Sequence, residues 1–421
     1  MPKRPTVASL KKVTPENLER LGVERLAQIL AQTADGRPEL KRRLRMELAA
    51  EQGAEHLALE IDKRLGSLET SKGKVSWRQR GAFVRDVEAL RVLIVDRLAG
   101  PEPDAALARL WQLIGAQRRI AGRMRDKDGS LAAVFGRVAE DVGTLLARGD
   151  STSGGAALAE AIAADPLGWA TRLEPVLGKV SPELAHVALV RLSADARATA
   201  SWLPILRRLA DATGDANAYR ATFTEQALKD PSVAAEVAMR LLAAGRADEA
   251  GRVLEGAAPK AATGLSRRPA EPDPEWEGAW IAWLEASGRR DDAQAARWAS
   301  FERTLSAERA RDYVRRLPDF DDVEAEQKAF DLAAAHRDFE TGLRFLMEWP
   351  ALAEAARMIQ ARGEEAQLPA DAAEAWAAKL RVRFPDAAHL LLRKAAAAAF
   401  RRRDFATCDR LTAEAEALSA D

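Results

Sequence analysis

Residues 238–255 read AMRLLAAGRADEAGRVLE, and residues 281–298 read IAWLEASGRRDDAQAARW. In both stretches an alanine-rich segment ends at a glycine, and an acidic residue three places later opens a second alanine-rich segment. Glycine readily adopts the left-handed conformation that ends many helices, and an acidic N-cap satisfies the free N–H groups of the next helix. Each stretch therefore predicts a helix, a tight turn and a second helix. The same order recurs more loosely at 330–346 and 396–411.

The composition favours helices along the whole chain. Hydrophobic residues make up 47% of the 421 residues, but aromatic residues make up only 5%, and alanine is the dominant apolar type. Alanine, leucine, arginine and glutamate are strong helix formers, whereas the residues that favour strands are sparse. We predict an all-α fold without a sheet. Small alanines on facing helices and the absence of a strict repeat length indicate an irregular α-solenoid of stacked helix hairpins, similar to tetratricopeptide or HEAT arrays.

Turn-forming residues divide the chain into segments. We expect a flexible basic arm over 1–13 and an N-terminal helical domain over 14–148, which opens with Thr as N-cap and Pro at the first helical position. A polar loop at 149–155 is the expected boundary. Helical repeats follow over 156–258, then a proline-rich linker or loop over 259–274. Tetratricopeptide-like repeats are expected over 275–421.

Charge and cysteine content restrict the class of protein. The formal net charge is zero, but residues 1–130 carry 26 basic and 18 acidic side chains, so this portion is basic and the remainder is acidic. A basic portion can attract anions or nucleic acid. The alternative is that the oppositely charged portions of the chain simply attract each other. Cys408 is the only cysteine, which excludes an internal disulfide and a cysteine-based zinc site. No apolar run has a transmembrane length and no secretory signal is visible, so we expect a cytoplasmic protein.

Basic clusters in the N-terminal portion are candidates for an anion or nucleic-acid surface. Helical spacing places several of these side chains on shared faces, and such stripes can follow a phosphate backbone. The alternative is ordinary solvated helix surface. A further basic stretch, Trp77-Arg78-Gln79-Arg80, contains an aromatic residue. The candidate residues are Lys41, Arg42, Arg43, Arg45, Arg118, Arg119 and Arg123.

Three of the ten tryptophans lie on one predicted helical face, at positions 276, 280 and 283. The first interpretation is a bulky seam that fills space between alanine-rich helices. The second is a partly exposed partner-binding surface, because tryptophan is enriched at interface hot spots. For a continuous repeat array we expect Trp280 and Trp283 to be largely buried, and Trp276, next to the proline-rich stretch, to be the least buried.

Several segments together resemble an uncharacterised family of helical-repeat proteins from high-GC proteobacteria. They are NLERLGVERLA at 17–27, AARW at 295–298, FERTLS at 301–306, LPDFDDVEAE at 317–326 and EWPAL at 348–352. The C-terminal repeats are also similar to those that follow SWIM-type zinc fingers, although the Cys and His zinc ligands are missing here. The resemblance implies a helical fold and no particular activity.

No catalytic, cofactor-binding or metal-binding motif is visible. The chain lacks an H-E-x-x-H helix, a nucleophile elbow, a Walker loop and a dinucleotide fingerprint. We therefore expect a non-enzymatic scaffold or adaptor that presents a helical-repeat surface to another protein. The alternative is a nucleic-acid-associated accessory protein that uses the basic N-terminal helices. The sequence does not indicate the biological role.

Overall fold

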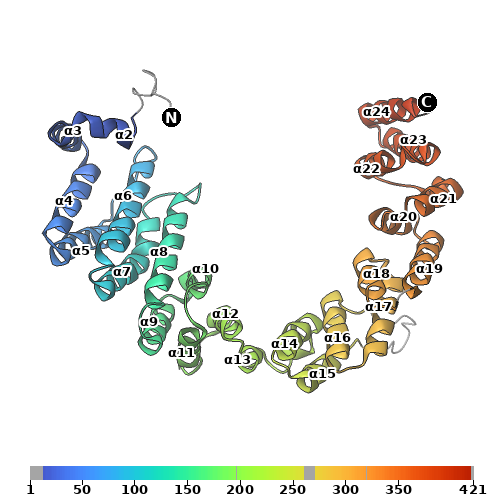
Figure 1. Cartoon of the computed structure of the whole chain (residues 1–421), viewed down its shortest axis with the longest axis horizontal. Helices are drawn as coiled ribbons and strands as arrows, with labels where there is room; N and C mark the ends of the chain where they lie inside the picture. The colour runs from blue at the N-terminus through green and yellow to red at the C-terminus, as the bar shows by residue number, and fades with distance from the viewer. Residues whose placement is uncertain (1–12, 196, 260–270, 319, 419–421) are drawn as a thin grey trace, which may run out of the picture. The chain divides into compact units, whose positions relative to one another are not determined.

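The computed structural model describes residues 13–195, 197–259, 271–318 and 320–418, and every regular element in these ranges is a helix (Figure 1). The predicted all-α fold is thus confirmed for the described residues, which contain no strand. Two compact units divide the chain, Met1–Thr224 and Glu225–Asp421. No helix in the described ranges is both long enough and apolar enough to cross a membrane.

In the first unit, some helices pack on the next helix along the chain, as α4 does on α5 and α7 on α8. Others pack on the next helix but one, as α8 does on α10 and α9 on α11. Leucine, isoleucine and valine side chains fill the space between them. The helices are α2 (Pro15–Leu18), α3 (Val23–Asp35), α4 (Pro38–Gln52), α5 (Ala54–Thr70), α6 (Arg80–Leu93), α7 (Pro103–Ala121), α8 (Ser130–Leu146), α9 (Ser151–Ala164), α10 (Pro166–Leu177), α11 (Pro182–Ser193), α12 (Leu203–Thr213) and α13 (Ala216–Ala221).

The second unit is also a succession of packed helices, and alanine supplies much of its core. Its helices are α14 (Pro231–Ala243), α15 (Ala247–Gly256), α16 (Pro274–Ala286), α17 (Arg290–Thr304), α18 (Ala307–Val314), α19 (Asp321–Ala335), α20 (Phe339–Glu348), α21 (Leu352–Arg362), α22 (Ala370–Leu380), α23 (Pro385–Arg401) and α24 (Phe405–Ala417).

The turns expected in the two similar stretches are present. Gly245 and Gly288 have φ angles of 73° and 76°, and the next residue in each case donates its backbone N–H to the carbonyl oxygen five residues earlier. This is the hydrogen bond of a Schellman motif. The structure corrects one detail, because Arg246 and Arg289 occupy the N-cap positions and the acidic residues lie in the first turn instead.

The polar loop predicted at 149–155 is wrong over most of its length, because α9 begins at Ser151. Asp150 caps this helix and accepts the N–H of Ser153 at 2.7 Å. Gly154 and Gly155 are buried inside the helix, and a Cβ atom at Gly155 would lie 2.6 Å from the backbone of α11. The glycines allow α9 and α11 to approach closely, a tertiary role that a polar, glycine-rich composition does not reveal.

Several other segments differ from expectation or lie outside the described ranges. The predicted N-terminal helix begins at Pro15 as expected, but Gly22, with a φ of 76°, divides it into α2 and α3. The chain divides into two compact units after Thr224, and the domain boundaries placed at 149–155 and 259–274 stay predictions. The predicted arm lies outside the described residues except for Val13, as does most of the predicted linker.

Candidate nucleic-acid interface

Of the four basic side chains predicted on α4, two are held in ion pairs. Lys41 pairs with the last residue of α3 at 3.2 Å, and Arg42 Nη2 lies 3.2 Å from Oδ1 of Asp86 on α6. Arg43 and Arg45 are exposed, and neither makes an ion pair with any residue that the structure describes. The cluster on α4 is therefore only partly available to an anion.

At the end of α7, the predicted arginines have different surroundings. Arg118 and Arg119 are exposed, whereas Arg123 is half-buried. The Arg123 guanidinium lies 5.1 Å from the centre of the Phe83 ring, and its Nε donates to the carbonyl oxygen of Gly73 at 2.9 Å. Arg123 thus anchors the segment that joins α5 to α6, in addition to carrying charge.

Three hydrogen bonds hold two basic segments side by side, the one between α5 and α6 and the one that follows α7. Besides the bond from Arg123 to Gly73, Lys74 Nζ donates to the carbonyl oxygen of Gly122 at 2.8 Å, and the Val75 N–H donates to that of Arg123 at 2.8 Å. The side chains of Lys74 and Arg123 thus donate to carbonyl oxygens rather than to carboxylates. Their hydrogen bonds therefore fix the segments without neutralising the charges.

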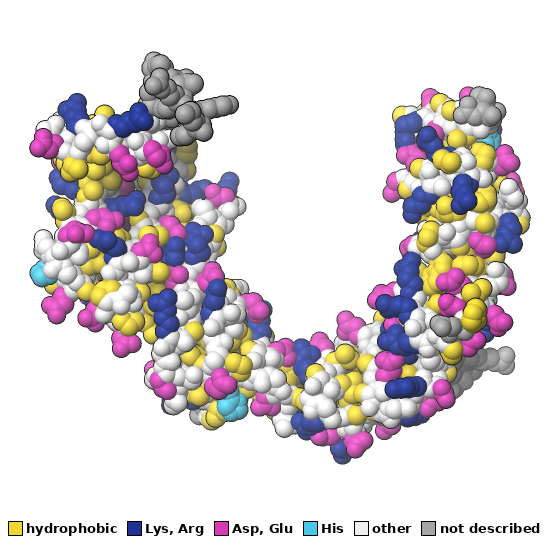
Figure 2. Space-filling model, in the orientation of Figure 1, with side chains coloured by type: hydrophobic (Ala, Val, Ile, Leu, Met, Phe, Trp, Pro, Cys, Tyr) yellow, Lys and Arg dark blue, Asp and Glu magenta, His cyan; other side chains and the backbone are white. Residues whose placement is uncertain are grey.

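An exposed aromatic ring lies within this basic region. Trp77 is 75% exposed, and the Arg78 guanidinium lies 5.2 Å from the centre of its ring. Figure 2 shows Lys and Arg side chains gathered where α6 begins and beside the loop that precedes α8. We name this region the Trp77 surface and define it by Lys72, Lys74, Trp77, Arg78, Arg123, Arg125 and Lys127.

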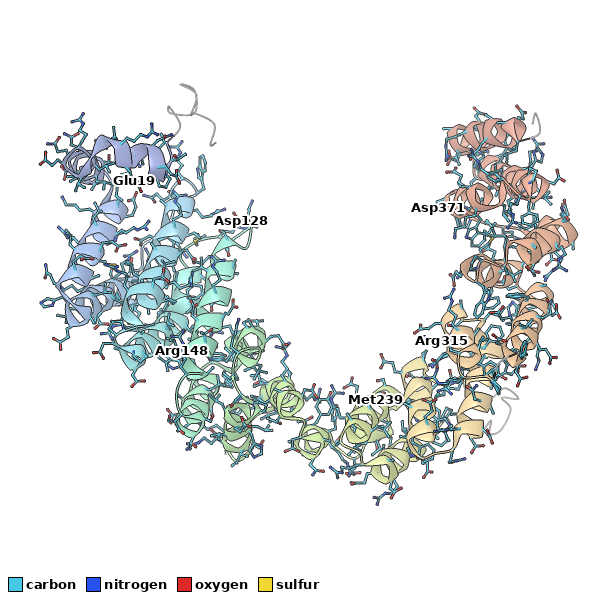
Figure 3. The ribbon with its side chains drawn as sticks, viewed as in Figure 1. Glu19, Asp128, Arg148, Met239, Arg315 and Asp371 are labelled. Atoms are coloured by element: carbon cyan, nitrogen blue, oxygen red, sulfur yellow. The ribbon has the colours of Figure 1, made fainter. Side chains whose placement is uncertain are left out.

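Two carboxylates close to this region act mainly as helix caps. Asp126 accepts the N–H of Ala132 at 2.9 Å, and Asp128, labelled in Figure 3, accepts the hydroxyl of Ser130 at 3.0 Å. The hydrogen bonds from Ser130 lower the pKa of Asp128, so this side chain is charged at neutral pH. Residues 71–80 carry four basic and no acidic side chains, so positive charge still exceeds negative charge on the Trp77 surface.

The tryptophans of α16 form a packed seam. The ring of Trp276 stacks on that of Trp280 with centres 5.2 Å apart, and Trp280 lies 4.6 Å from Trp283. Trp276 and Trp283 donate their indole N–H groups to the carbonyl oxygens of Leu254 and Ala247 on α15, each at 3.0 Å. Trp283 is buried as expected, but Trp276 is also buried, at 7% exposed, and Trp280 is only half-buried. The geometry favours the packing interpretation over the partner surface.

Sequence reasoning missed a buried ionic cluster in the second unit. Arg297 on α17 is 1% exposed and pairs with Glu285 on α16 at 2.6 Å and with Asp312 on α18 at 2.7 Å. In an arginine-rich chain a single buried arginine has no sequence signature. The cluster joins three consecutive helices and its charges are mutually satisfied, so we interpret it as structural. In the described ranges no group of three or more His, Cys, Asp or Glu side chains is placed to hold a metal ion.

Comparison with known proteins identifies a family but no relative of known activity. The chain matches no curated protein and no solved structure. The likeness to repeats that follow SWIM-type zinc fingers, and the proteobacterial origin, therefore stay predictions. One family model, described as a family of unknown function, matches residues 8–201 and 188–420. Because these matches span nearly the whole chain, the protein belongs to this family of unknown function, DUF6880.

Proposed function

We propose that the chain is a non-enzymatic, cytoplasmic bacterial binding protein built as an irregular α-solenoid of tetratricopeptide-like or HEAT-like helix pairs. Among possible ligands, we propose a single-stranded nucleic acid, bound by the first unit at the Trp77 surface. The observation that carries this proposal is the exposed Trp77 ring, which has the Arg78 guanidinium over it. Lys74 and Arg123 of the same surface donate to carbonyl oxygens rather than to carboxylates. An aromatic ring among unpaired positive charges is the arrangement with which many proteins hold single strands.

The physical basis has two parts. Phosphate groups release bound counterions when they meet Lys and Arg, which favours binding irrespective of sequence. A base that stacks on an exposed aromatic ring adds about 1–3 kcal/mol and needs no hydrogen bond to a base edge. Trp77 offers such a ring, and the hydrogen bonds between the two basic segments hold the neighbouring charges in place.

The test measures binding of the full chain to fluorescently labelled single-stranded DNA and RNA by anisotropy. Trp77→Ala should weaken binding by about 5-fold or more if one base stacks on the ring. Phe400→Ala is the matched control, because Phe400 is an exposed aromatic residue of the second unit, 61% exposed. Equal affinities of the wild type and Trp77→Ala, or equal losses in both variants, would refute stacking on Trp77.

The second candidate is a protein adaptor, and one observation favours it. The apolar stripe of α3 is uncovered, with Val23 84% exposed and Leu30 44% exposed. An amphipathic helix ordinarily buries such a stripe, and uncovered apolar surface is typical of interaction sites. If a protein covers this face, Val23→Asp and Leu30→Asp should abolish binding of that protein, while nucleic-acid binding at the Trp77 surface stays unchanged.

A further inference from the structure

A cavity of about 180 Å³ lies between α4, α5 and α6 of the first unit. Its walls are mostly apolar, and they include Leu40 and Met46 from α4 and Leu90 from α6. Benzene occupies a cavity of about 150 Å³ in another protein, so this space is adequate for one small organic molecule.

Arginines line the same cavity and outnumber the carboxylates that balance them. Arg64 pairs with Asp86, and both side chains are nearly buried in the wall. Arg42 also pairs with Asp86, at 3.2 Å, so two guanidinium groups share one carboxylate. Burial lowers the pKa of Arg64 and the charge of Asp86 raises it again in part.

Two further arginines, Arg43 and Arg85, line the cavity and are exposed. Neither makes an ion pair with a described residue, and Glu39 is the one other acidic residue among the lining side chains. In addition, the Nε atoms of Arg42 and Arg64 are buried without a hydrogen-bond partner in the described structure. The lining therefore combines an apolar floor with an excess of guanidinium groups.

We propose that this cavity binds a small organic carboxylate, an anion with an apolar body of about the size of a benzene ring. The body lies against Leu40, Met46 and Leu90, and the carboxylate meets the guanidinium groups of Arg43 and Arg85. Arginine suits this role because its planar donors match the two oxygens of a carboxylate. This site is distinct from the Trp77 surface, and the inference does not depend on nucleic-acid binding.

The test uses benzoate as the probe and the full chain, with binding followed by calorimetry or ligand-observed magnetic resonance. Benzamide, a neutral molecule of the same shape, reports the contribution of charge, and inorganic phosphate reports the contribution of the apolar body. We expect benzoate to bind at about millimolar concentration, as suits a ligand of so few atoms. Benzamide and phosphate should each bind about tenfold more weakly, since each lacks one of the two recognised features.

Two variants locate the site. Arg43→Ala combined with Arg85→Ala should remove the preference for benzoate over benzamide, and Ala82→Leu should reduce the binding of both by filling the cavity. Arg45→Ala is the matched control, because Arg45 is exposed on the same helix and does not line the cavity. The proposal is overturned if benzoate does not bind, if benzamide or phosphate binds as tightly, or if Arg45→Ala weakens binding as much as the double substitution.

Discussion

Replacing Trp283 with alanine removes a side chain that packs α16 against α15. The indole of Trp283 is 9% exposed, donates a 3.0 Å hydrogen bond to the Ala247 carbonyl oxygen and packs against Trp280. It also lies directly over Gly251, where a Cβ atom would come within 2.6 Å of the ring. The substitution thus leaves a cavity, a carbonyl group that has lost its indole donor, and open space above a glycine.

The expected loss of stability follows from these contacts. Truncating a buried tryptophan to alanine costs about 3–5 kcal/mol, through lost transfer free energy and the residual cavity. Trp283→Phe keeps a ring but loses the indole hydrogen bond, so we expect a smaller cost of about 1–2 kcal/mol. Trp280 is half-buried and makes no such hydrogen bond to α15, so Trp280→Ala should cost less than Trp283→Ala.

Gly251→Ala provides a sharper test, because whether it destabilises or stabilises the protein should depend on the presence of the Trp283 indole. In the wild-type background, Gly251→Ala drives a methyl group into the indole ring and should destabilise the second unit by about 1–3 kcal/mol. In the Trp283→Ala background the obstacle is gone, and the helix propensity of alanine should stabilise the protein by about 1 kcal/mol. The two effects make a double-mutant cycle whose coupling reports the contact.

The assay is urea unfolding of the full chain, followed by far-ultraviolet circular dichroism and fitted with one or two transitions as the two units require. Trp77→Ala is the control, because Trp77 is exposed and its loss should change stability by less than about 0.5 kcal/mol. Two results would refute the packing argument: a Trp283→Ala variant within about 1 kcal/mol of the wild type, or a Gly251→Ala cost that is the same in both backgrounds.

Three further predictions concern other contacts. Gly155→Ala should destabilise the protein by about 1–3 kcal/mol, because the added methyl group meets the backbone of α11. Gly136→Ala, at a position with open space, should instead stabilise α8. Thermal unfolding should show a lower midpoint for the first variant and a higher one for the second. Arg297→Met should cost about 1–3 kcal/mol, measured by urea unfolding, because it removes the buried cation that Glu285 and Asp312 share and leaves the more exposed Arg316 to pair with both carboxylates. Hydrogen bonds from Arg197 lower the pKa of Asp195 to about 2. The charged carboxylate therefore contributes stability above about pH 4, and this contribution is lost as the pH falls toward about 2. In Asp195→Asn the midpoint of unfolding should accordingly depend less on pH between these values than it does in the wild type.

Local patterns in the sequence predicted the helices and most of their ends well. Asp165, Ser181 and Asp230 are N-caps whose side chains accept backbone N–H groups. Each is followed by proline, a local pattern that is typical of helix starts. Gly245 and Gly288 end their helices in the left-handed conformation for the same local reason. Such features depend on a few neighbouring residues, so sequence alone is enough to find them.

Features that depend on contacts between helices escaped sequence reasoning. The glycines at 154 and 155 suggested a loop, but they serve close packing inside a helix. Arg42 was grouped with surface charges although it pairs with Asp86, 44 residues further along the chain. The Trp77 surface likewise depends on contacts between segments that are distant in the sequence. The sequence showed that the segments around Trp77 and Arg123 are basic, but only the hydrogen bonds between them show that they form one surface.

The most direct test of the proposed function is the salt dependence of single-strand binding by the full chain. For single strands, the logarithm of the binding constant should fall with the logarithm of salt concentration by about 0.7 for each phosphate contact. The Trp77 surface has six cationic side chains, so a slope as steep as about −4 is expected. Lys72→Ala with Arg125→Ala should reduce the slope by about 1.4, whereas Arg381→Ala with Arg383→Ala, two exposed arginines of the second unit, should leave it unchanged. No measurable binding at low ionic strength, or a slope that both double variants share with the wild type, would contradict the proposed interface.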